Sequence, residues 1–162
     1  MLIILKNKDT LVCDNFEFKC SIGQRGSTFK KKEGDKKTPK GSFSIGPLFI
    51  RKDRNNVPKT KLKIIKINKN MGWCDDENHQ KYNQLIDINK NIKCEKLFRR
   101  DYKYDFLVPI NYNTSKPKKN KGSAIFLHLT KNYQKTLGCI ALKKKDFLVL
   151  IKLIDKKTKI KI

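Results

Sequence analysis

Short runs in which apolar and polar residues alternate dominate this chain of 162 residues. Period-two alternation is typical of strands that bury one face and expose the other. Residues 2–6 and 10–13 predict a hairpin that turns at residues 7–9, and residues 16–20 continue it as a third strand. Further strands are expected at residues 42–45, 61–67, 85–88, 104–110, 124–128, 139–142 and 158–162.

Helical patterns are rare in this sequence. Residues 146–154 are the strongest candidate, because an acidic residue opens them and suits a helix N-terminus, and residues 94–100 predict a second, short helix. Two polar stretches that contain glycine, residues 23–41 and 70–84, predict long loops. No internal repeat or linker-like segment interrupts the chain. We therefore expect a mainly β fold with one or two short helices, in a single domain over residues 1–162.

Positive charge is the most unusual feature of the composition, with 39 Lys and Arg residues against 15 Asp and Glu and a net charge of +24. Such an excess makes a nucleic-acid partner the first hypothesis. The charge is spread along the chain, however, and in residues 62–67 Lys alternates with apolar residues, as on the solvated face of a strand. We therefore expect a generally cationic surface with a weak attraction to anionic polymers, and this pattern disfavours a dedicated nucleic-acid site.

No segment has the length and apolarity of a transmembrane helix or of an export signal. The apolar run at residues 1–5 is shorter than the roughly 7–15 residues that a signal needs, and residues 147–154 include Lys152 and fall well short of a bilayer span. The five cysteines contain no CxxC pair, so neither a zinc ribbon nor a thioredoxin-type site is indicated. The odd number leaves at least one free thiol in a monomer, and we expect no cofactor and no metal.

Cys139 and His128 are the candidate catalytic residues. Each lies at the end of an apolar strand, and a polar loop joins the two strands, so the side chains are expected within hydrogen-bond reach of each other. A neighbouring imidazole makes a thiol nucleophilic by accepting its proton. Gly138 allows a sharp bend and a close approach of substrate, and backbone N–H groups there are candidate donors to an oxyanion. The alternative is that both side chains simply pack in the core, where Cys is common.

Several motifs in the right order resemble the YkuD-type L,D-transpeptidase catalytic domain. They are the TPKGSF segment at residues 38–43, His128, and a Thr-x-Gly-Cys-Ile signature at residues 136–140. The stretches at residues 23–26, 32–35, 72–75, 104–105 and 122–128 resemble a compact bacterial branch of that family. The resemblance extends from about residue 20 to the end of the chain. It implies a β-sandwich-like fold in which Cys139 is the nucleophile, His128 is the general base and acid, and Gly138 and Thr136 frame the nucleophile.

The resemblance also implies a substrate and a location. The donor would be a peptidoglycan stem tetrapeptide, which would acylate Cys139 through meso-diaminopimelate and release D-alanine, and the resulting thioester would react with an amine or with water. The family acts in the periplasm or cell envelope, where the cationic surface would meet anionic envelope polymers, but no signal peptide is visible in this chain. In many members the oriented histidine bonds a backbone carbonyl, which agrees with the lack of Asp and Glu in residues 122–142.

Two positions depart from the family pattern. Leu137 and Ala141 occupy sites where many members have His and Arg, and that Arg is associated with substrate placement. Arg25 and Lys143 are candidate replacement cations, and Trp73 is either a wall of the substrate groove or a core anchor. The alternatives to a transpeptidase are an L,D-carboxypeptidase or amide hydrolase that uses the same Cys and His, and a non-catalytic cationic module that binds envelope polymers or nucleic acid.

Overall fold

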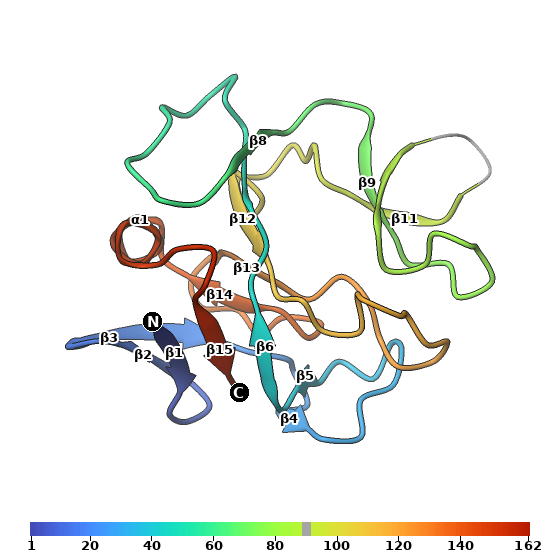
Figure 1. Ribbon diagram of the computed structural model, residues 1–162, viewed down its shortest axis with the longest axis horizontal. Helices are drawn as coiled ribbons and strands as arrows, with labels where there is room; N and C mark the ends of the chain where they lie inside the picture. Colours follow the sequence, from blue (N-terminus) through green and yellow to red (C-terminus); the bar gives the residue numbers. More distant parts are fainter. Residues whose placement is uncertain (89–91) are drawn as a thin grey trace.

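One curled sheet of ten strands holds most of the β structure, and this computed structural model describes residues 1–88 and 92–162 (Figure 1). Its strands, in chain order, are β1 (Leu2–Leu5), β2 (Thr10–Cys13), β3 (Phe16–Ser21), β6 (Ser42–Ser44), β7 (Leu48–Ile50), β8 (Ile64–Lys66), β12 (Phe106–Pro109), β13 (Phe126–Leu129), β14 (Ile140–Leu142) and β15 (Lys159–Lys161). Across the sheet they follow the order β6-β15-β1-β2-β3-β14-β13-β12-β7-β8. The predicted hairpin and its third strand are confirmed as β1, β2 and β3.

Two smaller sheets complete the β structure. The first contains β9 (Met71–Cys74), β10 (Leu85–Asp87) and β11 (Cys94–Lys96), with β9 in the middle. The second is a parallel pair of β4 (Ser27–Thr28) and β5 (Thr38–Pro39). Figure 1 shows β9 and β11 on the opposite side of the molecule from helix α1. The expected mainly β, sandwich-like fold is confirmed.

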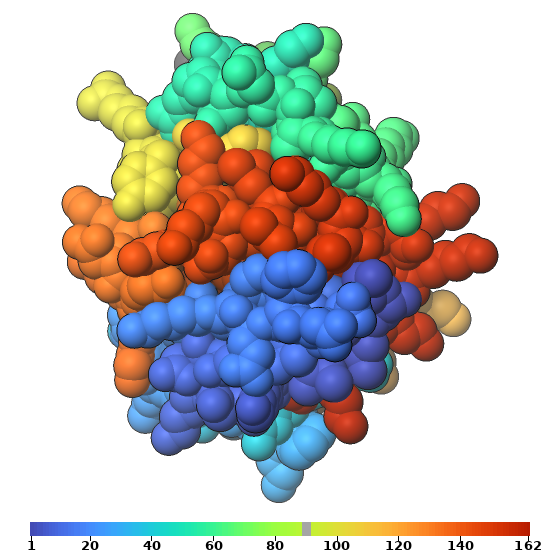
Figure 2. All heavy atoms as spheres, turned by 90° about the vertical axis from the view of Figure 1, so that its left-hand side faces the viewer, coloured from blue at the N-terminus to red at the C-terminus, as the bar shows by residue number. Residues whose placement is uncertain are grey.

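Helix α1 (Lys144–Leu153) covers one face of the large sheet. It buries Phe147 and Leu150, and Asp146 lies in its first turn, where a negative charge suits the helix dipole. The helix begins two residues earlier than the sequence pattern predicts. In Figure 2 it lies between the N-terminal strands and the segment around residue 60, and the Thr60 hydroxyl donates to the Ile151 carbonyl at 2.8 Å. No helix among the described residues has the length and apolarity to cross a membrane.

The two faces of β13 pack into different clusters of buried side chains. Leu127 and Leu129 join the large cluster beneath α1. Phe126 joins a second cluster with Trp73 and Leu107, between the large sheet and the β9–β11 sheet. Because side chains alternate along a strand, His128 faces the same side as Phe126. The fold thus directs a histidine away from the main core and toward the second layer.

Three predicted segments differ from the structure, and one strand outside them was missed. The predicted loop at residues 23–41 contains the short parallel strands β4 and β5. Residues 94–100 are not helical, because residues 94–96 form β11 and pair with β9. The predicted loop at residues 70–84 contains β9, a short strand whose two neighbours supply its hydrogen bonds. The strand at residues 48–50 was not expected because all three side chains are buried, which removes the alternation that marks a half-buried strand.

Candidate active site

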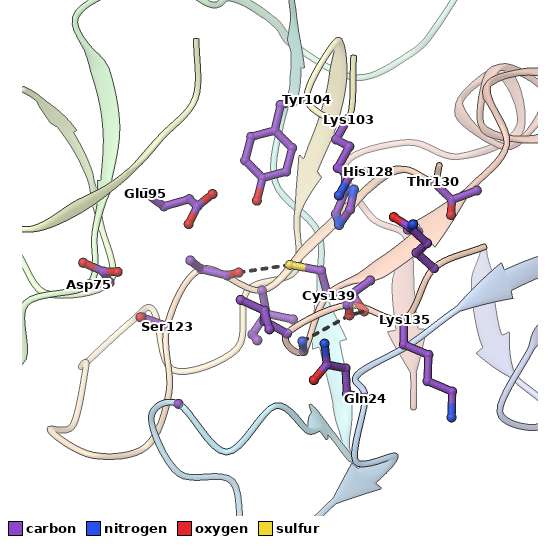
Figure 3. Close-up of a pocket in the computed structure, with 18 of the residues that line it drawn as sticks. Gln24, Asp75, Glu95, Lys103, Tyr104, Ser123, His128, Thr130, Lys135 and Cys139 are labelled. Carbon is purple, nitrogen blue, oxygen red and sulfur yellow. Dashed lines mark hydrogen bonds between the residues drawn. The ribbon is translucent and has the colours of Figure 1, made fainter. Parts of the chain in front are cut away.

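His128 and Cys139 lie on neighbouring parallel strands. His128 is in β13 and is opposite Ala141 of β14, and Cys139 immediately precedes β14. Residues 130–138 connect the strands, and both side chains are more than nine-tenths buried. Figure 3 shows the imidazole and the thiol on the wall of one cavity. Both side chains line this cavity, but the expected hydrogen-bond contact between them is not seen among the described residues, where each side chain hydrogen-bonds to backbone groups.

The Cys139 thiol is held in its neutral form by its surroundings. It donates to the Ala124 carbonyl at 3.2 Å and accepts the Phe126 N–H at 3.4 Å. Burial raises the pKa of Cys139 to about 12 because the thiolate loses its solvation. Ala124 has a φ of 52°, in the left-handed region that a residue with a Cβ rarely adopts. Such backbone strain concentrates at functional sites. Here it accompanies the orientation of the Ala124 carbonyl toward the Cys139 thiol.

The His128 ring is fixed in one tautomer. Its Nδ1 lies 2.9 Å from the Leu129 carbonyl oxygen, which can only accept, so Nδ1 carries the proton and Nε2 is a free base. Burial, together with the positive charges of Lys103 and Arg99, lowers the pKa of His128 to about 4. The Tyr104 ring packs edge-on against the imidazole, with 5.3 Å between ring centroids. The histidine is thus neutral and oriented by a carbonyl.

Thr136 and Gly138 shape the turn that presents Cys139. The Thr136 hydroxyl donates to the Cys139 carbonyl at 2.6 Å and accepts the Gly138 N–H at 3.1 Å. Gly138 has a φ of 143°, and a Cβ at this position would lie 2.9 Å from the Lys37 carbonyl oxygen, so only glycine fits. The Gly138 N–H is therefore engaged, whereas the Cys139 N–H has no hydrogen-bond acceptor among the described residues.

The cavity around Cys139 has a volume of about 560 Å³, and charged side chains of both signs line it. In Figure 3, Asp75 and Glu95 lie on one side of the thiol, while Lys135 lies on the other side with His128 and Thr130. Among the described residues, one carboxylate oxygen of Asp75 is buried without a hydrogen-bond partner, and burial raises the pKa of this carboxyl. The cavity is thus suited to a ligand that carries both an amine and a carboxylate.

Arg25 and Trp73 lie outside this cavity. Trp73 is 8% exposed, stacks edge-on against Phe126 and donates its indole N–H to Asn83 at 2.9 Å. Arg25 lines a second, cationic hollow of about 350 Å³ that shares Gln24 and Lys135 with the first. The structure therefore brings Cys139, His128, Gly138 and Thr136 together at one cavity. Arg25 lines the neighbouring hollow, and Trp73 is buried in the second cluster.

The positions that depart from the family pattern differ in their exposure. Leu137 lines the cavity and is 68% exposed, whereas Ala141 is buried beside it. Lys143 lies over the Tyr133 ring at 5.1 Å and does not line the cavity. Cationic side chains reach the cavity from elsewhere, because Lys31, Lys93, Arg99, Lys103, Lys131 and Lys135 all line it. The loss of one arginine does not leave the cavity without positive charge.

Asn83 supports the site and was not anticipated from the sequence. Its side-chain oxygen accepts the Trp73 indole N–H and, at 3.0 Å, the Ala124 N–H. Its side-chain nitrogen donates to the carbonyls of Tyr112 and Asn113 at 2.9 and 2.7 Å. One side chain thus ties β9 to the residue whose carbonyl holds the Cys139 thiol. The one signal in the sequence was the residue type, because Asn tolerates the left-handed backbone conformation, and the φ of Asn83 is 57°.

Comparison with protein families agrees with this geometry. The YkuD profile, described as the L,D-transpeptidase catalytic domain, matches residues 2–162. The chain belongs to the YkuD family. Comparisons with curated proteins and with solved structures find no match. The YkuD match includes β1 to β3, which the sequence motifs did not cover, and it implies transpeptidase activity in general and peptidoglycan as the substrate class. Within residues 1–88 and 92–162, no three His, Cys, Asp or Glu side chains are grouped to hold a metal.

Proposed function

We propose that this chain is a cysteine-dependent L,D-transpeptidase that acts on peptidoglycan stem peptides in cell-wall remodelling. The observation that carries the proposal is a neutral thiol and a neutral, oriented imidazole on the wall of one charged cavity. Membership of the YkuD family supports the transpeptidase class. The assignment of Cys139 as nucleophile and of His128 as base rests on the geometry of these two side chains.

In the first step the thiol gives its proton to Nε2 of His128 as the sulfur attacks the substrate. Sγ of Cys139 bonds to the carbonyl carbon of meso-diaminopimelate in the donor stem peptide, and the carbonyl oxygen becomes an oxyanion. The Cys139 N–H is the backbone donor available to this oxyanion. The amide bond to D-alanine then breaks, and His128 gives its proton to the leaving amine. A thioester on Cys139 remains.

The second half of the reaction repeats these roles with a new nucleophile. An amine of a second stem peptide loses a proton to His128 and attacks the thioester carbonyl. Collapse of the intermediate forms the cross-linking amide and expels the sulfur, which recovers a proton from His128. The carboxyl groups of Asp75 and Glu95, which line the cavity together with Lys93 and Arg99, are the candidate partners for such an amine. Water in place of the amine would give a carboxypeptidase product.

The resting thiol must change partner before it reacts. In the free protein it donates to the Ala124 carbonyl, and burial disfavours a preformed thiolate–imidazolium pair. We therefore expect proton transfer to accompany attack, with the substrate displacing the thiol from Ala124. In such a mechanism, the free thiol is less reactive toward simple alkylating agents than toward an acylating substrate.

The decisive experiment measures the intact mass of the purified protein after incubation with a carbapenem and, separately, the products from purified muropeptides. A covalent adduct is expected on the peptide that contains Cys139. A cross-linked dimer would support transpeptidation, while a trimmed tripeptide would assign the hydrolase. Absence of both an adduct and a thioester would overturn the catalytic proposal and favour a binding module. A binding module for nucleic acid would show affinity that weakens steeply with salt.

Arg25 is expected to bind a carboxylate of the donor peptide from the hollow next to the cavity. Its loop is fixed beside the nucleophile, because the Gln24 N–H donates to the Thr136 carbonyl at 2.9 Å. Arg25→Gln is expected to raise KM for a tetrapeptide donor about tenfold and to change kcat little, since a charge-assisted hydrogen bond is lost. Arg100→Gln removes the same charge from an exposed residue outside both hollows and is the matched control. Equal effects of the two variants would contradict a specific role for Arg25.

A further inference from the structure

Two of the five cysteines lie opposite each other on neighbouring strands of the small sheet. Cys74 of β9 is the register partner of Cys94 of β11. Cys13 and Cys20 have no such relation, because Cys13 is opposite Phe16 and Cys20 is opposite Leu142. Cys94 is the one cysteine that is not fully buried. The sheet has therefore placed a protected thiol directly across from an accessible one.

The hydrogen bonds of this strand pair fix the separation of the two cysteines. The Asp75 N–H donates to the Lys93 carbonyl at 3.4 Å, and the Leu97 N–H donates to the Met71 carbonyl at 3.1 Å. Hydrogen-bonded and non-hydrogen-bonded positions alternate in an antiparallel ladder, so Cys74 and Cys94 occupy a non-hydrogen-bonded position. Cα atoms at such positions are about 4.5 Å apart, which lies within the range that a disulfide spans.

Both side chains point to the same face of the sheet and have room to turn. Gly72 lies two residues before Cys74 on that face, and a Cβ at Gly72 would be 2.8 Å from the Cys94 Sγ. The Cys94 sulfur thus rests over the bare backbone of this glycine. The Cys74 thiol makes only a long contact of 3.9 Å with the Asp76 carbonyl. Among the described residues, neither sulfur has a strong hydrogen bond that would oppose rotation toward the other.

We propose that Cys74 and Cys94 are a thiol-oxidation site and form a cross-strand disulfide when a small-molecule disulfide is the oxidant. The Cys94 thiolate attacks one sulfur of the oxidant, which releases one small thiol and leaves a mixed disulfide on Cys94. The Cys74 thiolate then attacks the Cys94 sulfur and releases the second small thiol. Two protein thiols are oxidised, and one disulfide is reduced to two thiols.

This bond would tie together two strands that line the candidate active site. Asp75 follows Cys74 on β9, while Lys93 and Glu95 flank Cys94, and all three side chains line the cavity around Cys139. The disulfide would therefore hold these three charged side chains of the cavity wall in one arrangement. The proposal concerns thiols outside the reacting pair and stands whether or not Cys139 is the nucleophile.

Intact-mass measurement and peptide mapping test the proposal. The full chain is incubated with oxidised glutathione at pH 8.5, because burial raises the pKa of both thiols and slows exchange at neutral pH. The expected product is lighter by two hydrogens and yields one linked peptide pair that contains Cys74 and Cys94. Its melting temperature is expected to rise by about 6 °C and to return to the starting value with a reductant.

Matched variants separate this pair from the other thiols. Cys94→Ser should form no such link and show no oxidant-dependent rise in melting temperature, whereas Cys139→Ala and Cys20→Ala should retain both. Cys94 is partly exposed, so its serine variant is expected to fold, and circular dichroism in reductant checks this. A stable glutathione adduct on Cys94 that Cys74 never displaces would overturn the proposal. So would a link that joins either residue to a different cysteine.

Discussion

Replacing Cys139 with alanine is expected to abolish the carbapenem adduct and all transfer to muropeptides, and replacing His128 with glutamine is expected to slow both by roughly a thousandfold. The first change removes the atom that forms the covalent bond. The second keeps a polar side chain of similar size but removes the base that accepts the thiol proton. The rate of adduct formation, followed by intact mass, measures both effects.

Controls for this prediction must show that the fold survives, because both residues are buried. Cys20→Ala removes an equally buried thiol from another part of the sheet and should leave the rate of adduct formation unchanged. Melting temperatures should be compared for all variants. A His128→Gln variant that acylates at the rate of the parent protein would show that another group accepts the proton. An adduct that persists in Cys139→Ala would show that the nucleophile is a different residue.

The pH dependence of acylation follows from the buried histidine. An ordinary imidazole would be half protonated near pH 6.5, and acylation would already decline there. Burial lowers the pKa of His128 to about 4, so its Nε2 stays available as pH falls from 7 to 5 and is lost only as pH falls through about 4. The rate constant for the carbapenem adduct should therefore be flat between pH 7 and 5. A decline centred at pH 6.5 would mean that the ring is solvated when it reacts.

Removing the Asn83 side chain is expected to destabilise the protein by about 3 kcal/mol, which should lower its melting temperature by roughly 10 °C. Four hydrogen bonds converge on this buried amide, and their partners include the Trp73 indole and the Ala124 N–H. These partners would remain buried without a bond. Because Ala124 carries the carbonyl that holds the Cys139 thiol, carbapenem acylation should also slow. Urea unfolding and adduct formation measure the two effects.

Two variants separate the lost hydrogen bonds from backbone strain. Asn83 has a φ of 57°, which glycine adopts freely, so Asn83→Gly reports mainly the lost bonds, and Asn83→Ala adds the cost of strain. Asn120 has a φ of 58° and is exposed, so Asn120→Gly provides the matched control and should change stability by less than about 0.5 kcal/mol. An Asn83→Gly protein as stable as the parent would contradict the bracing role of this side chain.

Local sequence patterns predicted much of the fold and part of the candidate active site. Alternation predicted the hairpin and its third strand, because each of these strands has one buried and one exposed face. The sequence around residues 136–140 pointed to a bent backbone before Cys139, and Gly138 has the conformation that this requires. The two apolar runs that became β13 and β14 were expected as strands, but their parallel direction was not, because a short connection is typical of an antiparallel hairpin.

The second layer could not be predicted from such patterns. Strand β9 has no alternation, and it is a strand because β10 and β11 supply hydrogen bonds on both edges. Residues 94–96 were expected in a helix, yet pairing with β9 overrides that local preference. The charged residues that line the cavity come from segments far apart in sequence. The four hydrogen bonds of Asn83 likewise join distant segments. Long-range contacts of this kind leave no periodic signal in the chain.

The position of β15 in the large sheet constrains how this protein can fold. Residues 159–161 lie between β1 and β6, in parallel register with one and antiparallel register with the other (Figure 1). Until they arrive, β1 and β6 each present a row of unpaired backbone groups, which invites pairing with another chain. Synthesis must therefore reach residues 159–161 before β1 and β6 can be joined in one sheet. We expect the nascent protein to depend on chaperones that shield open strand edges.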